Sequence, residues 1–216
     1  KEDKIKDLVL VEDSMTGFMQ AQKGCENFGL NLIFGLRISV CNKLSDEGDT
    51  NSCSKVIIFA KNPNGCKLLN KIFTEASLKG GGAIDYELLL SMWGDDLKLA
   101  IPFYDSFIFN NAFSFSNCVP NFGEIRPTFF LEENGLPLDN IILDKVISFC
   151  SDSLPTEWVK SIYYNKRSDY DAYVTYKCVC NRKNFMASLD KPKFDHLGSR
   201  EFCLESWREN NERRSS

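Results

Sequence analysis

The chain has 216 residues, 43% of them hydrophobic and 26% charged, which is typical of a globular protein with one sizeable core. Its formal net charge of -4 provides no overall attraction to a phosphate backbone, and no block of Lys and Arg stands out, so direct nucleic-acid binding by this chain alone is disfavoured. The single histidine, His196, excludes most metal sites and catalytic groups that rely on imidazole, and its polar surroundings predict a surface residue.

Nine cysteines are scattered along the chain, mostly inside apolar segments. Their number is odd, and the sequence shows no Asn-x-Ser/Thr acceptor, no secretory signal pattern and no apolar run of membrane length. We therefore expect reduced thiols in a cytoplasmic protein that has no membrane partner.

Residues 8 to 37 predict a strand, a helix and a second strand. The first apolar run meets Glu12 and Asp13, and the second apolar run ends at Arg37. Because α/β folds place their chemistry at strand ends, these polar residues are candidates for a functional site. The two acids are either a general acid/base pair or the partners of an ion pair with Arg37. Adjacent residues on a strand point to opposite faces, so at most one acid faces a cleft unless the strand has ended.

The rest of the chain alternates between expected strands and helices, which predicts a parallel α/β sheet or barrel. A helix that begins with turn residues and stops at three glycines is favoured over a phosphate-binding loop, because no GK[ST] follows the glycines. The expected elements are a loop at 42–54, a buried strand at 55–61, that helix at 62–82, an Asp-capped helix at 84–96, a strand running into a loop at 97–110, a strand at 125–137, an amphipathic helix at 138–153 and a strand at 158–164.

Several strings in this order resemble the PHP (polymerase and histidinol phosphatase) domain of bacterial and phage DNA polymerase III alpha subunits, the C-family replicative polymerases. The most specific is "IIFAKNPNGCKLLNKIFTEAS"; "VEDS", "FGLR", "FLEENGLP" and "VKSIYYNKRSDYDAYVTYKCV" are the others. The resemblance implies a distorted (β/α)7-type barrel of PHP type over residues 1–210, followed by a polar tail at 211–216. The family's first strand would be missing, because the chain begins just before the second one.

The family holds a metal cluster with His, Asp and Glu side chains at its strand ends, and this chain departs from that pattern. A guanidinium at the position of a bridging carboxylate would repel the cation. The resemblance therefore implies a degenerate metal cleft with no catalytic residue, no metal ligand and no cofactor. Its six positions are Glu12, Asp13, Arg37, Asn134, Ser161 and Tyr163.

A degenerate site in such a domain implies a non-catalytic scaffold in DNA replication, although the parent family is a DNA-directed DNA polymerase. The implied partners are the remaining polymerase domains or subunit, with a proofreading exonuclease as a further candidate, and the implied location is the cytoplasm, or the host cytoplasm for a phage protein. Two alternatives stay open: a metal-dependent phosphoesterase or 3′-5′ exonuclease, and a viral protein-interaction module with a borrowed PHP fold.

Aromatic residues gather before the C-terminal segment. Tyr163, Tyr164 and Tyr170 either pack in the core and at its rim or form a platform for stacked bases. The pattern favours packing.

Overall fold

The computed structural model divides into two compact units. Unit 1 comprises Lys1–Phe130 and Cys150–Thr156, and unit 2 comprises Leu131–Phe149 and Glu157–Ser216. The predicted loop at 42–54 lies largely outside the described residues. Those residues are 5–44, 53–79, 81–151, 153–180, 196 and 198–215.

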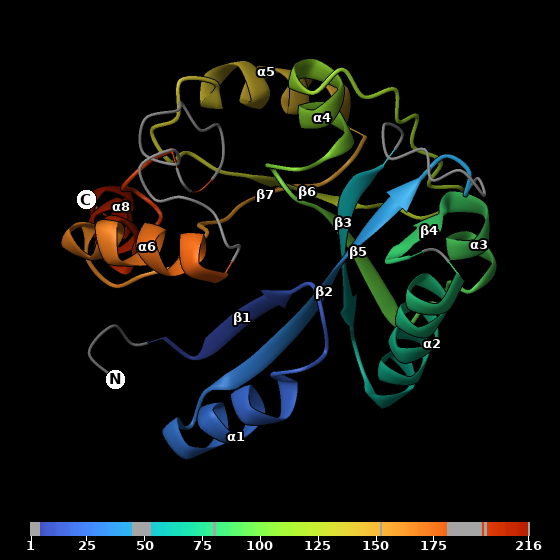
Figure 1. The fold of residues 1–216 in the computed structure, drawn as a ribbon, viewed down its shortest axis with the longest axis horizontal. Helices are drawn as coiled ribbons and strands as arrows, with labels where there is room; N and C mark the ends of the chain where they lie inside the picture. The colour runs from blue at the N-terminus through green and yellow to red at the C-terminus, as the bar shows by residue number, and fades with distance from the viewer. Residues whose placement is uncertain are drawn as a thin grey trace. The chain divides into compact units, whose positions relative to one another are not determined.

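Unit 1 is built on a curled, mixed sheet with the strand order β1-β2-β3-β5-β6 (Figure 1). The long strand β2 has β3 on one edge, while β1 and β4 share its other edge. The chain passes from unit 1 into unit 2 within β6 and again within β7. The strands are β1 (Asp7–Glu12), β2 (Asn31–Cys41), β3 (Ser54–Ala60), β4 (Ala83–Asp85), β5 (Leu97–Ile101), β6 (Thr128–Leu131) and β7 (Thr156–Trp158).

The prediction of an all-parallel sheet is wrong at β3, which runs antiparallel to both β2 and β5. The β1–β2, β2–β4 and β5–β6 pairs are parallel, as expected. The physical reason lies in the sequence between β2 and β3: it is polar and without helical periodicity, whereas parallel neighbours are usually joined through a crossover helix.

The helices of unit 1 follow the apolar periodicity, with one exception. Asp85 caps α3 by accepting a hydrogen bond from the Leu88 amide at 2.7 Å, which confirms the predicted cap. The prediction of a loop after β5 is wrong, because a buried helix begins after Ser106, whose hydroxyl accepts from the Phe109 amide. The bounds are α1 (Phe18–Phe28), α2 (Pro63–Lys79), α3 (Tyr86–Ser91) and α4 (Phe107–Phe113).

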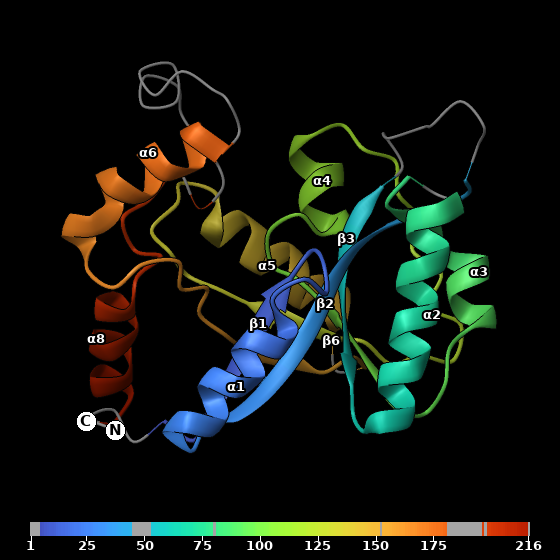
Figure 2. The same ribbon diagram turned by 60° about the horizontal axis from the view of Figure 1, so that its bottom comes forward.

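The core of unit 1 lies between α2 and the central strands, and Figures 1 and 2 show α2 running alongside them. Leu36, Ile58 and Leu99 sit opposite one another on β2, β3 and β5, and all three are fully buried. Leu69 and Ile72 of α2 are buried as well. Each such side chain contributes roughly 1.5 to 3 kcal/mol by leaving water.

Unit 2 contains mostly helices. The expected strand at 158–164 is wrong over most of its length: β7 ends at Trp158, and Tyr164 makes only an isolated bridge to Cys203. Its apolar residues instead join an aromatic cluster. Among the described residues of both units, no helix combines the length and apolar character that a membrane span requires. The helices are α5 (Asp139–Cys150, whose last residue belongs to unit 1), the short η2 (Arg167–Asp169), α6 (Tyr170–Cys180) and α8 (Leu204–Ser215).

Gly65 lies in the first turn of α2, at a point where no side chain fits. Its amide donates to the Asn62 side chain at 3.0 Å, and an added Cβ would collide with the Asp96 carbonyl oxygen and lie 3.3 Å from the Ala60 Cα. We expect Gly65→Ala to lower the free energy of unfolding by about 1 to 2 kcal/mol. Gly24→Ala is the matched control: a Cβ there meets nothing within 4 Å in α1, so it should stabilise by up to about 1 kcal/mol. Urea unfolding measures both changes. If the two substitutions changed the free energy of unfolding in the same direction, Gly65 would not be as closely packed against Asp96 as described.

Candidate functional site

Arg37 and Asp13 form a bidentate ion pair at one edge of the unit 1 sheet. The Arg37 Nε and Nη2 atoms donate to the two Asp13 carboxylate oxygens at 2.7 and 3.0 Å. The strand register explains the meeting: Glu12 pairs with Leu36 across the parallel strands β1 and β2, so Asp13, which follows β1, comes level with Arg37. The prediction that the second strand ends at Arg37 is wrong, because β2 continues to Cys41 and Arg37 lies within it. The Arg37 side chain is 30% exposed and that of Asp13 is 55% exposed.

Two further charged residues complete this cluster. Asp105 lies 3.8 Å from Arg37 Nη1, and Lys55 Nζ lies 3.9 Å from an Asp13 oxygen. Asp105 adopts a left-handed backbone conformation (φ 63), and its carbonyl accepts from the Lys55 amide at 2.8 Å. The cluster therefore contains two cations and two carboxylates whose formal charges cancel.

Of the two acids predicted at the end of β1, only Asp13 is shown bonding to Arg37. Glu12 is the last residue of β1 and is exposed, whereas Asp13 follows the strand and is free of its alternation. Both Asp13 oxygens accept from the guanidinium. A base at Asp13 would have to break this pair before it could take a proton, so the geometry favours the ion-pair interpretation over acid/base chemistry.

Glu132 is the centre of a second polar cluster, which lies in unit 2. It is 5% exposed and follows β6, and its oxygens accept from the Asn134 side-chain amide at 2.9 Å and from the Ser161 amide and hydroxyl at 3.0 and 2.9 Å. Burial raises the pKa of Glu132, while the hydrogen bonds from Asn134 and Ser161 and the charge of Lys160 oppose that rise. Burial also lowers the pKa of Lys160, whose ammonium group donates to the Glu133 carbonyl.

Asn134 is fully buried and is fixed from several directions. Its backbone amide and that of Leu136 donate to one Asp139 oxygen at 2.8 and 3.0 Å, and the Ser199 hydroxyl donates to its carbonyl oxygen. The turn between them contains Gly135 at φ 71, a conformation that glycine adopts without strain. The residues "EENGLPLD" thus form a rigid turn that leads from β6 into α5.

Tyr163 belongs to an aromatic cluster, and the surface prediction for His196 is wrong. The Tyr163 ring stacks on Tyr173 with centroids 5.6 Å apart, and the half-buried His196 ring lies 4.7 Å from it. Tyr164 packs against both Tyr170 and Tyr173, in agreement with the packing interpretation. The imidazole was misjudged because its polar sequence neighbours reveal nothing of the aromatic rings that reach it.

The six predicted cleft positions fall into different units. Glu12, Asp13 and Arg37 belong to unit 1, and Asn134, Ser161 and Tyr163 belong to unit 2. A single cleft formed by all six stays a prediction. Within the described ranges, no group of three or more His, Cys, Asp and Glu side chains is arranged to hold a metal ion.

A further ion cluster in unit 2 was not foreseen. The Arg167 guanidinium donates to both carboxylate oxygens of Glu201 and of Glu209, with all four distances at 2.8 Å. The hydrogen bonds from Arg167 lower the pKa of Glu201 to about 2, although burial acts to raise it. Glu201 and Glu209 lie far from Arg167 in sequence, so the sequence pattern could not predict that the three residues meet.

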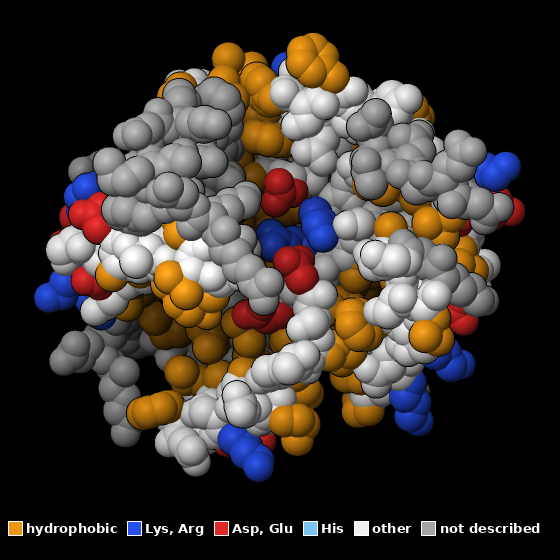
Figure 3. All heavy atoms as spheres, in the orientation of Figure 1, with side chains coloured by type: hydrophobic (Ala, Val, Ile, Leu, Met, Phe, Trp, Pro, Cys, Tyr) orange, Lys and Arg blue, Asp and Glu red, His pale blue; other side chains and the backbone are white. Residues whose placement is uncertain are grey.

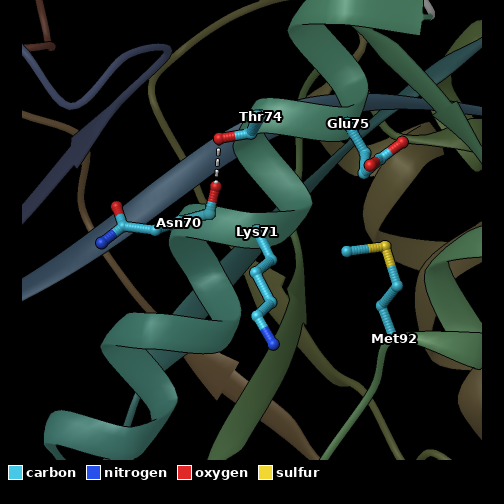
Figure 4. A pocket seen from close by; sticks show the side chains of 5 residues that line it. All are labelled: Asn70, Lys71, Thr74, Glu75 and Met92. Carbon is cyan, nitrogen blue, oxygen red and sulfur yellow. Dashed lines mark hydrogen bonds between the residues drawn. The ribbon is translucent and has the colours of Figure 1, made fainter.

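A shallow hollow lies along α2 in unit 1. It has a volume of about 410 Å³ and is open to solvent. Figure 4 shows Met92 extending toward Glu75, with Lys71 pointing away, and the Thr74 hydroxyl donates to the Asn70 carbonyl at 2.8 Å. These groups do not converge on a common point. On the face drawn in Figure 3, basic and acidic side chains are interspersed.

No protein family model matches the chain, and no curated protein is significantly similar to it.

Proposed function

We propose that the chain is a non-catalytic, PHP-like scaffold in DNA replication, either part of or split from a C-family DNA polymerase III alpha subunit. The observation that carries the proposal is the bidentate Arg37–Asp13 pair, which joins the carboxyl end of β1 to the neighbouring parallel strand β2. Strand ends of this kind hold cations in the family that the sequence resembles. Here a guanidinium supplies the positive charge, and a fixed arginine has no open position for a substrate or a water.

The most specific matching string gives additional support. In "AKNPNG", the Asn62 side chain accepts from the Gly65 amide and donates to Asp96, so these residues anchor the start of α2 to the turn before β5. The residues of this string therefore hold the fold together, which is consistent with a scaffold. The partners we propose are the remaining polymerase domains or subunit, with a proofreading exonuclease as a further candidate, in the cytoplasm of a bacterium or of a phage host.

We expect the purified protein to bind no Zn, Mn or Fe at stoichiometric level and to show only background phosphatase and 3′-5′ exonuclease activity with added Mn. The reason is that the described residues gather no set of hard ligands, and Arg37 repels a cation beside Asp13 at the end of β1. Elemental analysis after chelator treatment and a nuclease assay measure this. A Mn-dependent rate that Asp13→Ala abolishes would instead support the metal-dependent enzyme.

The scaffold role is tested with the polymerase itself. If the reading frame beside this chain encodes a palm and fingers, co-expression should yield a complex that survives size-exclusion chromatography. A chain encoded alone, with no affinity for a C-family polymerase body, would overturn the scaffold and favour the protein-interaction module.

A further inference from the structure

Three cysteines converge at one end of the unit 1 sheet, outside the charged cluster. Cys41 is the last residue of β2, and Cys53 directly precedes β3. The last registered pair between these antiparallel strands is Val40 with Ser54, so Cys41 and Cys53 are the next residues outward in the same register. Cys118 lies in the segment after α4.

The contacts of these thiols place them in one cluster. Cys41 is 1% exposed and its sulfur lies 3.7 Å from the Ile84 carbonyl oxygen, while Cys53 is half-buried. The Cys118 sulfur lies 3.5 Å from the Ser54 hydroxyl and 3.9 Å from that of Tyr86. Burial, followed by the charge of Cys53 and a hydrogen bond between the two thiols, raises the pKa of Cys41 to about 12.

We propose that Cys41 and Cys53 are a reversible redox pair that closes into a cross-strand disulfide by exchange with a small disulfide such as oxidised glutathione. All nine cysteines are thiols in this structure. Directly opposite residues on antiparallel strands have Cα atoms about 4.5 to 5.5 Å apart, and a disulfide requires about 4.4 to 6.8 Å. The pair therefore needs little backbone movement to close.

The exchange proceeds in two balanced steps. The more exposed thiol, Cys53, loses its proton, and its thiolate attacks one sulfur of the small disulfide; the old S–S bond breaks and one small thiolate leaves. Cys41 then loses its proton, and its sulfur attacks the Cys53 sulfur and releases the second small thiolate. The protein gives up two protons and two electrons, and the small disulfide becomes two thiols. Because the pKa of Cys41 is raised, the second step is the slower one and accelerates as the pH rises toward 12.

The bond would close a ring from Cys41 to Cys53 around the connection between β2 and β3. A cross-link of this kind restricts the unfolded chain more than the folded one. We expect the oxidised protein to melt about 5 °C or more above the reduced protein.

The test equilibrates the full chain in glutathione buffers of increasing oxidised fraction, quenches with acid, alkylates, and maps the linked peptides by mass. We expect a 41–53 linkage that dithiothreitol reverses, and Cys118→Ser should form it as readily as the unaltered chain. Cys41→Ser and Cys41→Ala should each leave a stable glutathione adduct on Cys53. Two variants are used so that the test still holds if one of them folds poorly. A linkage of Cys53 to Cys118 would overturn the proposal, as would modification of only the exposed Cys66 and Cys180.

Discussion

Glu132→Ala should lower the free energy of unfolding of unit 2 by roughly 2 to 4 kcal/mol. The substitution leaves a cavity at a 5% exposed position and removes the acceptor for three donors, which are the Asn134 side-chain amide and the backbone amide and hydroxyl of Ser161. Those donors join the turn after β6 to the segment after β7. Urea unfolding in a Trp93→Phe background measures this, because the two remaining tryptophans, Trp158 and Trp207, report on unit 2.

Glu132→Gln separates the charge of this group from its hydrogen bonds. The amide oxygen can still accept from Asn134 and the Ser161 amide, while the Ser161 hydroxyl turns to accept from the new NH₂ group. Since the folded-state pKa of Glu132 is raised above 4.5, its contribution to stability is fully present below pH 4.5 and is lost as the pH rises through the folded pKa. Glu132→Gln should therefore remove this decline.

The exposed neighbour Glu133 provides the control, and Glu133→Gln should leave the free energy of unfolding unchanged. A Glu132→Gln variant as unstable as Glu132→Ala would show that the charge itself is required, contrary to this account.

Arg37→Ala should destabilise unit 1 by about 1 to 2 kcal/mol, and Arg37→Glu by roughly 2 to 4 kcal/mol. The alanine value is moderate because the pair is partly exposed and solvent screens it. The glutamate substitution is worse because it adds a third carboxylate beside Asp13 and Asp105 and leaves Lys55 as the remaining cation of this described cluster. Fluorescence of Trp93, the tryptophan of unit 1, follows the unfolding.

Lys98→Ala is the control for this pair, because Lys98 is an exposed cation on β5, which β3 separates from β2. An Arg37→Ala protein that unfolds like the unaltered chain would mean that the guanidinium contributes nothing to holding the strand ends together. Rescue of Arg37→Glu by Mn, but not of Arg37→Ala, would indicate that these strand ends can still hold a cation.

Local signals predicted most of the secondary structure, and they failed where tertiary contacts decide. The Asp85 cap and the apolar spacing of α2 and α5 depend on residues close in sequence, so they could be predicted. The run before Asn110 looks like an extended segment because its buried residues are consecutive, yet Ser106 caps it as a helix. The direction of β3 has a local sign in the polar, non-periodic sequence before it, which shows no crossover helix pattern.

The candidate site divides in the same way. The meeting of Arg37 with Asp13 could be predicted, because the two residues come level with each other on neighbouring parallel strands, although Arg37 lies within β2 and not at its end. The approach of Lys55 and Asp105 could not, since it requires the antiparallel β3 and a left-handed turn that no local pattern indicates. Ser161 was placed at a strand end for the wrong reason: it reaches Glu132 from an irregular segment that the Val159 amide ties to the Leu131 carbonyl.

The shared edge of β2 also imposes an order of events on a growing chain. The first half of that edge pairs with β1, which is synthesised earlier, but Ser39–Cys41 pair with Ala83–Asp85, which follow more than forty residues later. Until the ribosome has passed Asp85, the second half of β2 can pair only with β3 and exposes a row of unsatisfied backbone groups next to the apolar Val40. A nascent or truncated chain that stops before β4 would therefore present an open template for pairing with other chains.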